Sequence, residues 1–160
     1  MRPLLAGLAL LTTILLSACG ETTVDATKGE RLIRGVVAEQ VDARVRSVRC
    51  PTGVKKQEGD TFTCTVTGVD GSRGDVVVTQ RDGGGLAVVA PFLHVREAET
   101  VMAARIGKRI KASDVKLSCP EIVVVKQGSL FKCEATAKGR ERNVTVRLTD
   151  AEGHFRYRLS

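Results

Sequence analysis

The chain carries the pattern Cys50-Pro51 … Gly59-x-x-Phe62-x-Cys64 and, 69 residues later, the pattern Cys119-Pro120 … Gly128-x-x-Phe131-x-Cys133. Five positions therefore match at identical spacing, which indicates an internal duplication. A length of 160 residues suits two very small domains as well as one ordinary domain, and it excludes a large multidomain enzyme. The duplication decides in favour of two small modules.

The N-terminal segment has the pattern of an export signal. Arg2 precedes an apolar run from Leu4 to Leu16, which spans only about 20 Å as a helix and is too short for a membrane core of about 30 Å. The sequence Leu16-Ser17-Ala18-Cys19-Gly20 that follows resembles the bacterial lipobox, in which the cysteine is lipidated. We predict a lipoprotein signal peptide over residues 1–18, a lipid anchor on Cys19 that holds the protein at the membrane, and a polar tether through residue 28. An ordinary signal peptide with a chance cysteine is the alternative.

The remaining four cysteines allow three disulfide connectivities. An exported protein meets an oxidising compartment, so paired cysteines favour disulfides over a zinc site or a redox site, and the sequence has no C-x-x-C. The repeat favours Cys50–Cys64 and Cys119–Cys133, because each copy is then closed by its own bridge. Each bridge closes a loop of about 15 residues, which contributes roughly 3 kcal/mol in the chain-entropy model.

Hydrophobic periodicity predicts one helix followed by short strands in each copy. Apolar residues recur with helical spacing from Leu32 to Val41 and from Val101 to Ile110. Alternation with a period of two predicts strands, in copy order, over residues 47–50, 61–67, 76–81 and 86–89 and over residues 115–119, 131–137, 144–148 and 154–159. We therefore predict an α+β fold in which each module packs an N-terminal helix on an antiparallel sheet of three to four strands. The predicted modules cover residues 29–92 and 93–160.

The combined pattern of lipobox, helix, Cys-Pro and G-x-x-F-x-C resembles an actinobacterial family described as domain of unknown function 4333, here in two copies. The resemblance rests on Cys50, Pro51, Gly59, Phe62 and Cys64 and on their counterparts 69 residues later. It implies a small envelope protein that is secreted or tethered to the membrane. It implies no activity and no catalytic residue.

Basic residues gather in the second copy. The whole chain has a formal net charge of +7, and residues 97–160 hold 13 Lys and Arg against 8 Asp and Glu. The predicted solvent face of the second sheet carries Lys132, Arg147, Arg156 and Arg158, together with His154, where the first sheet carries threonines. We predict that this face contacts an anionic envelope polymer, a lipid headgroup or an acidic envelope protein. An ordinary solvated charged surface is the alternative.

Other candidate sites carry little chemistry. The two histidines, His94 and His154, have no triad partners in sequence, and Glu121, Glu134 and Asp150 stand singly. We expect no catalytic residue, no metal, no cofactor and no nucleic-acid partner. The leading interpretation is a non-enzymatic binding or scaffolding protein anchored outside the cytoplasm. An envelope hydrolase that acts on wall polymers and a purely structural spacer are the alternatives.

Overall fold

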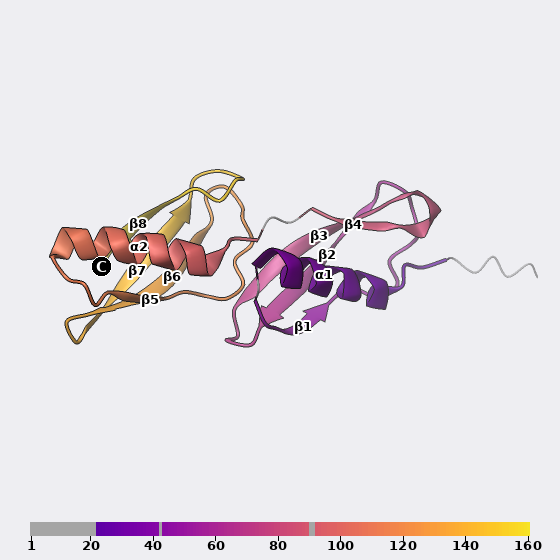
Figure 1. Cartoon of the computed structure of the whole chain (residues 1–160). Helices are drawn as coiled ribbons and strands as arrows, with labels where there is room; N and C mark the ends of the chain where they lie inside the picture. Colours follow the sequence, from indigo (N-terminus) through magenta and orange to yellow (C-terminus); the bar gives the residue numbers. More distant parts are fainter. Residues whose placement is uncertain (1–21, 42, 90–91) are drawn as a thin grey trace, which may run out of the picture.

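Each copy folds into one helix followed by four strands (Figure 1). The computed structural model describes residues 22–41, 43–89 and 92–160, and the predicted signal peptide and Cys19 lie outside these residues. Module 1 (residues 22–89) contains α1 (Ala26–Val41), β1 (Val45–Arg49), β2 (Thr61–Gly68), β3 (Arg73–Gln80), the short 3-10 helix η1 (Asp82–Gly84) and β4 (Leu86–Val88). Module 2 (residues 92–160) contains α2 (Val95–Ile110), β5 (Lys116–Ser118), β6 (Leu130–Ala137), β7 (Arg140–Leu148) and β8 (Phe155–Leu159).

Both sheets are antiparallel meanders, in the orders β1-β2-β3-β4 and β5-β6-β7-β8. The prediction of a helix on a small antiparallel sheet in each copy is therefore confirmed. Helix α2 begins six residues before the predicted start at Val101, because Val95 and Ala98 extend the buried stripe of Met102 and Ile106 by two turns. His94 directly precedes this helix, at its N-cap position.

Each helix covers one face of its own sheet, and the core lies between the two layers. In module 1 this core contains Ile33 and Val37 of α1 with Val48, Phe62, Cys64, Val66, Val76 and Val78 of the sheet. In module 2 it contains Met102 and Ile106 of α2 with Cys133, Ala135, Val144, Val146 and Leu148. Both predicted disulfides are present, with Cα atoms 4.3 Å apart for Cys50–Cys64 and 4.2 Å apart for Cys119–Cys133.

The repeated motif has the same structural role in both modules. Gly59 and Gly128 have φ values of +84° and +83°, a backbone conformation that favours glycine. Each glycine donates its N–H to the last residue of the third strand, at 2.9 Å to the carbonyl oxygens of Gln80 and Leu148. The glycine therefore sets the turn that leads into the second strand and its cysteine.

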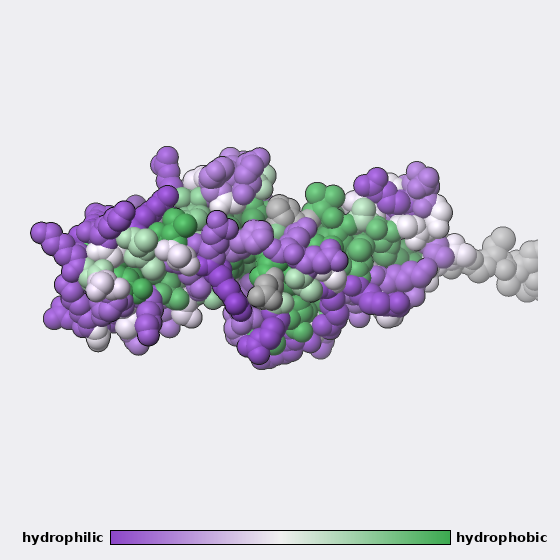
Figure 2. Space-filling model, viewed as in Figure 1, coloured by the Kyte–Doolittle hydropathy of each residue, from purple (hydrophilic) through white to green (hydrophobic). Residues whose placement is uncertain are grey.

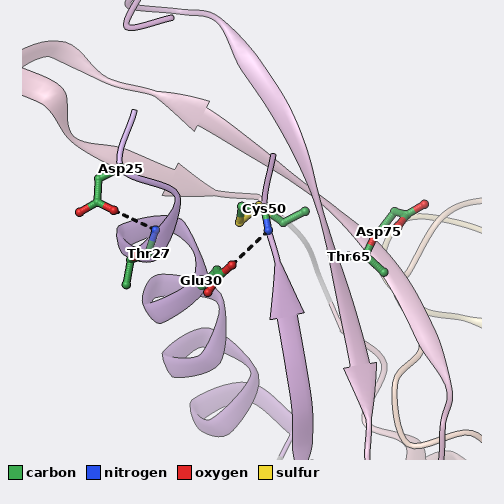
Figure 3. Close-up of a disulfide and its surroundings, with 7 residues drawn as sticks. Asp25, Thr27, Glu30, Cys50, Thr65 and Asp75 are labelled. Atoms are coloured by element: carbon green, nitrogen blue, oxygen red, sulfur yellow. Dashed lines mark hydrogen bonds between the residues drawn. A yellow bond between two sulfur atoms is a disulfide. The ribbon is translucent and has the colours of Figure 1, made fainter. Parts of the chain in front are cut away.

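A glutamate that sequence analysis missed supports each Cys-Pro loop. The N–H of Cys119 donates to Glu99 Oε1 at 2.7 Å, and the N–H of Cys50 donates to Glu30 Oε1 at 3.4 Å (Figure 3). Glu30 and Glu99 are themselves separated by the repeat offset of 69 residues, so the same comparison that revealed the cysteines could have found them. Each glutamate ties its helix to the residue where the disulfide begins.

The predicted tether of residues 19–28 is shorter in the structure. Thr23 forms an antiparallel bridge with Lys55, and α1 already begins at Ala26. The Asp25 carboxylate accepts the N–H of Thr27 at 2.9 Å, as expected of a residue that caps a helix N-terminus (Figure 3). Residues 22–28 therefore belong to module 1, and the same bridge recurs in module 2 between Phe92 and Val124.

The modules dock through the loop of residues 119–125, here called the junction loop. Ile122 of this loop is 2% exposed and belongs to the core cluster of module 1. The N–H groups of Glu121 and Ile122 donate to Asp70 Oδ2 at 2.9 Å and to Ser72 Oγ at 3.0 Å in the β2–β3 turn. The junction is therefore a packed contact that combines apolar burial with two specific hydrogen bonds.

Candidate functional site

The outer face of the module 2 sheet brings together all four predicted cationic residues. The strand register aligns Lys132, Thr145 and Arg158 in one row across β6, β7 and β8. The neighbouring row aligns Leu130, Arg147 and Arg156, and all four cationic side chains are exposed. We call these four residues, Lys132, Arg147, Arg156 and Arg158, the cationic face.

The cationic face has no acidic counterpart within its own two rows. Arg147 pairs directly with Arg156, and like charges directly opposite on adjacent strands destabilise a sheet. Among the described residues, no carboxylate forms an ion pair with any of the four. Glu134 lies in the next row, paired with Asn143, and borders the face. The arrangement concentrates positive charge on one side of the sheet at a cost to folding stability.

The equivalent face of module 1 is built differently. Its outward-facing positions on β2 are Thr61, Thr63, Thr65 and Thr67, and the Thr65 hydroxyl donates to Asp75 Oδ1 at 2.9 Å. The close-up in Figure 3 shows this pair on the strands beside the disulfide. The charge of the cationic face is therefore a property of the second copy and is not required by the fold.

His154 borders the cationic face at the β7–β8 turn, where its carbonyl accepts the N–H of Thr149 at 2.7 Å. Its Nδ1 lies 2.8 Å from Asp150 Oδ2, and Asp150 Oδ1 accepts the N–H groups of Glu152 and His154. Desolvation raises the pKa of Asp150, but the hydrogen bonds and the charge of His154 outweigh this effect and hold it below the usual value. One carboxylate oxygen each of Asp150 and Glu152 and one ring nitrogen of His154, the atom types that can bind a metal ion, lie within 4.8 Å of one another. This cluster acts as the hydrogen-bonding centre of the turn.

The singly placed carboxylates occupy different settings. Glu121 is in the junction loop, Glu134 is on the outer face of β6, and Asp150 is in the β7–β8 turn. Glu121 Oε2 is buried without a hydrogen-bond partner among the described groups. The structure thus does not bring these three residues together as the acid–base pair of a glycosidase.

Several hollows on the surface of the described residues were not predicted, among them the following three. One groove of about 810 Å³ lies at the junction, between the β3 side of module 1 and the junction loop. A cavity of about 620 Å³ lies at the far end of module 2, under the C-terminus of α2. A smaller one of about 250 Å³ is lined by both His94 and His154. Of the four exposed large apolar residues in the described chain, Val77, Val89 and Leu130 line the junction groove and Ile110 lines the end cavity.

The fold and the disulfides define a class: tandem modules in which a helix covers a four-stranded antiparallel sheet and one disulfide closes each unit. The chain belongs to the family described as domain of unknown function (DUF4333), whose profile matches residues 6–85 and again residues 83–153. No curated protein and no solved structure matches the chain.

The compartment follows from the disulfides. Disulfide bonds persist in oxidising, extracytoplasmic environments, so the two bridges indicate such a location for this protein. No helix among the described residues is both long enough and apolar enough to cross a membrane.

Proposed function

We propose that this protein is a non-enzymatic envelope module that binds an anionic component of the envelope through the cationic face. The observation that supports the proposal is the direct Arg147–Arg156 pair beside Lys132 and Arg158 on an exposed sheet. An anion that binds here relieves the repulsion between these side chains. The free energy that the repulsion costs on folding is therefore recovered on binding.

The proposal includes the lipoprotein and actinobacterial assignments made from the sequence. A diacylated or triacylated Cys19 would keep the protein at the membrane, because each buried CH₂ contributes about 0.8 kcal/mol. The short segment between Cys19 and Thr23 would then hold module 1 near the bilayer. Phosphate-bearing polymers and lipid headgroups are the anions within reach of a protein held in this way.

The test is salt-titrated binding of residues 20–160, which contain both folded modules in full, to vesicles with and without anionic lipid. A soluble polyphosphate polymer provides a second arm that distinguishes a wall polymer from a headgroup. The face variant combines four substitutions, K132Q, R147Q, R156Q and R158Q. A matched control removes the same charge from the helix side of module 2 by R105Q, K108Q, R109Q and K111Q, all at exposed positions.

Each cation near an anionic surface contributes about 1 kcal/mol, so the face variant should bind roughly a thousandfold more weakly at low salt. The control variant should retain binding to within a few-fold. Equal loss in both variants would show that only net charge matters and would reject the cationic face as a site. Absence of binding by the unmodified protein to either anion would reject the binding function and favour the spacer.

A further inference from the structure

The cavity at the far end of module 2, here called the end cavity, combines an apolar wall with a cationic rim. The wall is formed by Ile106, Ile110, Val115, Ala135, Ala137 and Leu159. The rim is formed by Lys138 of the β6–β7 turn, by Arg140 and Arg142 of β7, and by Ser160. No acidic side chain lines the cavity among the described residues, and the nearby Asp114 carboxylate accepts the N–H of Lys138 at 2.8 Å. Its volume of about 620 Å³ lies within the range of small-molecule sites. Apolar residues are visible at the surface below α2 at this end (Figure 2).

The same place in module 1 is filled. There Ile122 packs against Gly68 and Gly74 of the β2–β3 hairpin, at 3.0 Å and 3.2 Å from where a Cβ would lie. The strand pairs Val66–Gly74 and Ala135–Arg142 are equivalent in the two sheets, so Arg142 takes the place of Gly74 in module 2. The fold therefore has one hollow at this position in each module that accepts an apolar group, here called the seat. Only the module 1 seat is filled by another segment of the described chain.

The chemistry of the two seats differs in the polar groups beside them. The module 1 turn offers acceptors, Asp70 and Ser72, which bind the N–H groups of the peptide segment seated there. The module 2 turn offers the cationic donors Lys138, Arg140 and Arg142 instead. A peptide segment in the end cavity would leave its N–H donors facing cations, whereas an anionic head group supplies only acceptors.

A second copy of the chain does not match this seat either. At the positions of Ile122 and Val124, the Cys-Pro loop of module 1 has Gly53 and Lys55. That loop would bring no isoleucine to the apolar wall and would add a positive charge next to the rim. Its own counterpart, the junction loop, is already buried against module 1.

We propose that the end cavity binds a single alkyl chain with an anionic head group, most simply a long-chain fatty carboxylate. The chain lies against Ile106, Ile110 and Leu159, and the carboxylate is paired with Arg140 and Arg142. This site is separate from the cationic face, which lies on the other side of the same sheet, and it does not depend on the proposed function.

The test measures binding of laurate by titration calorimetry below its micellar concentration, with residues 20–160. Dodecyltrimethylammonium carries an alkyl chain of equal length with a positive head, and acetate carries the head without the chain. We expect one laurate per protein, and at least tenfold weaker binding of both comparison compounds. In methyl NMR spectra of the unmodified protein, laurate should shift Ile106, Ile110 and Leu159 and leave the module 1 core methyls unchanged.

Two variants separate the parts of the site. A137L fills the cavity from a partly exposed position, and R140Q/R142Q removes the rim charge; each should weaken laurate binding at least tenfold. The matched pair K132Q/R158Q removes equal charge from the cationic face and should leave laurate binding unchanged. The proposal is overturned if laurate does not bind, if the cationic amphiphile binds as tightly, or if laurate shifts methyls elsewhere. Self-association that grows with protein concentration and displaces laurate would also overturn it, in favour of a second copy.

Discussion

Replacing Gly74 by alanine places a methyl group 2.6 Å from Val124 Cγ2 and 3.2 Å from Ile122 Cγ2. The first distance is shorter than carbon atoms tolerate, so one of the two groups has to move. Val124 is β-branched and therefore stiff at χ1, and its backbone is held by the bridge to Phe92. We expect the junction loop as a whole to move away from the β2–β3 hairpin.

The expected loss of docking free energy follows from the contacts that the junction loop loses. Overpacking of this kind costs about 1–3 kcal/mol, and full burial of an isoleucine contributes about the same amount. Ile122 is 2% exposed, so displacement of the loop removes nearly all of that contribution. The hydrogen bonds from Glu121 and Ile122 to the turn are lost with it. A loss of about 2–3 kcal/mol corresponds to a 30- to 150-fold change in the docking equilibrium.

The measurement is amide hydrogen exchange at Glu121 and Ile122, with ¹⁵N relaxation to report whether the two modules tumble together. In Gly74→Ala both amides should exchange at least tenfold faster, and each module should tumble more rapidly. The control is Gly35→Ala on α1, where an added Cβ meets no atom within 4 Å. Unchanged exchange and unchanged tumbling in Gly74→Ala would show that the junction is not a tight contact and would refute the reasoning.

Three further outcomes are expected. Replacing Cys119 and Cys133 together by alanine should lower the unfolding free energy of module 2 by roughly 3 kcal/mol in chemical denaturation. Glu99→Ala leaves the N–H of Cys119 without its acceptor and should cost about 1–3 kcal/mol in the same measurement. Desolvation raises the pKa of Asp70, but hydrogen bonds from Ser72 and Glu121 outweigh this effect, so the pKa lies below its usual value. Ionised Asp70 therefore stabilises the folded protein. This stabilisation is complete above about pH 4 and is lost as the pH falls through the folded-state pKa. The Glu121 amide shift should follow this titration in NMR, and the effect should vanish in Asp70→Asn.

The features that follow from spacing along one chain segment could be predicted from the sequence. Alternation from residue 61 to 67 places Phe62, Cys64 and Val66 on one face of a strand, so the cysteine had to point toward the helix. The repeat then selected one of three disulfide pairings. The cationic face follows for the same reason, because a period of two assigns Lys132 and Arg158 to the outer side of the sheet without knowledge of the register.

The features that depend on contact between distant segments could not be predicted. The run Ile122-Val123-Val124-Val125 is visibly apolar in the sequence, but nothing in it identifies the β2–β3 hairpin as its partner. The end cavity depends on Ala135 and Ala137 being small at the point where α2 ends, which is a property of packing. Glu99 is an intermediate case, because the repeat offset marks the residue but not its hydrogen bond to Cys119.

The two copies differ in the loop and the hairpin that meet at the junction. The module 2 loop has apolar residues that pack into module 1, and the module 1 hairpin supplies Gly74 and Asp70 to receive them. The other two ends have the opposite properties: the module 1 loop carries Lys55, and the module 2 hairpin carries Arg142 where a glycine would be needed. A further module therefore cannot dock at either end by the same contacts. The module 2 hairpin thus carries cationic residues where the module 1 hairpin carries the groups that receive a loop, and for this reason the end cavity suits an anionic ligand.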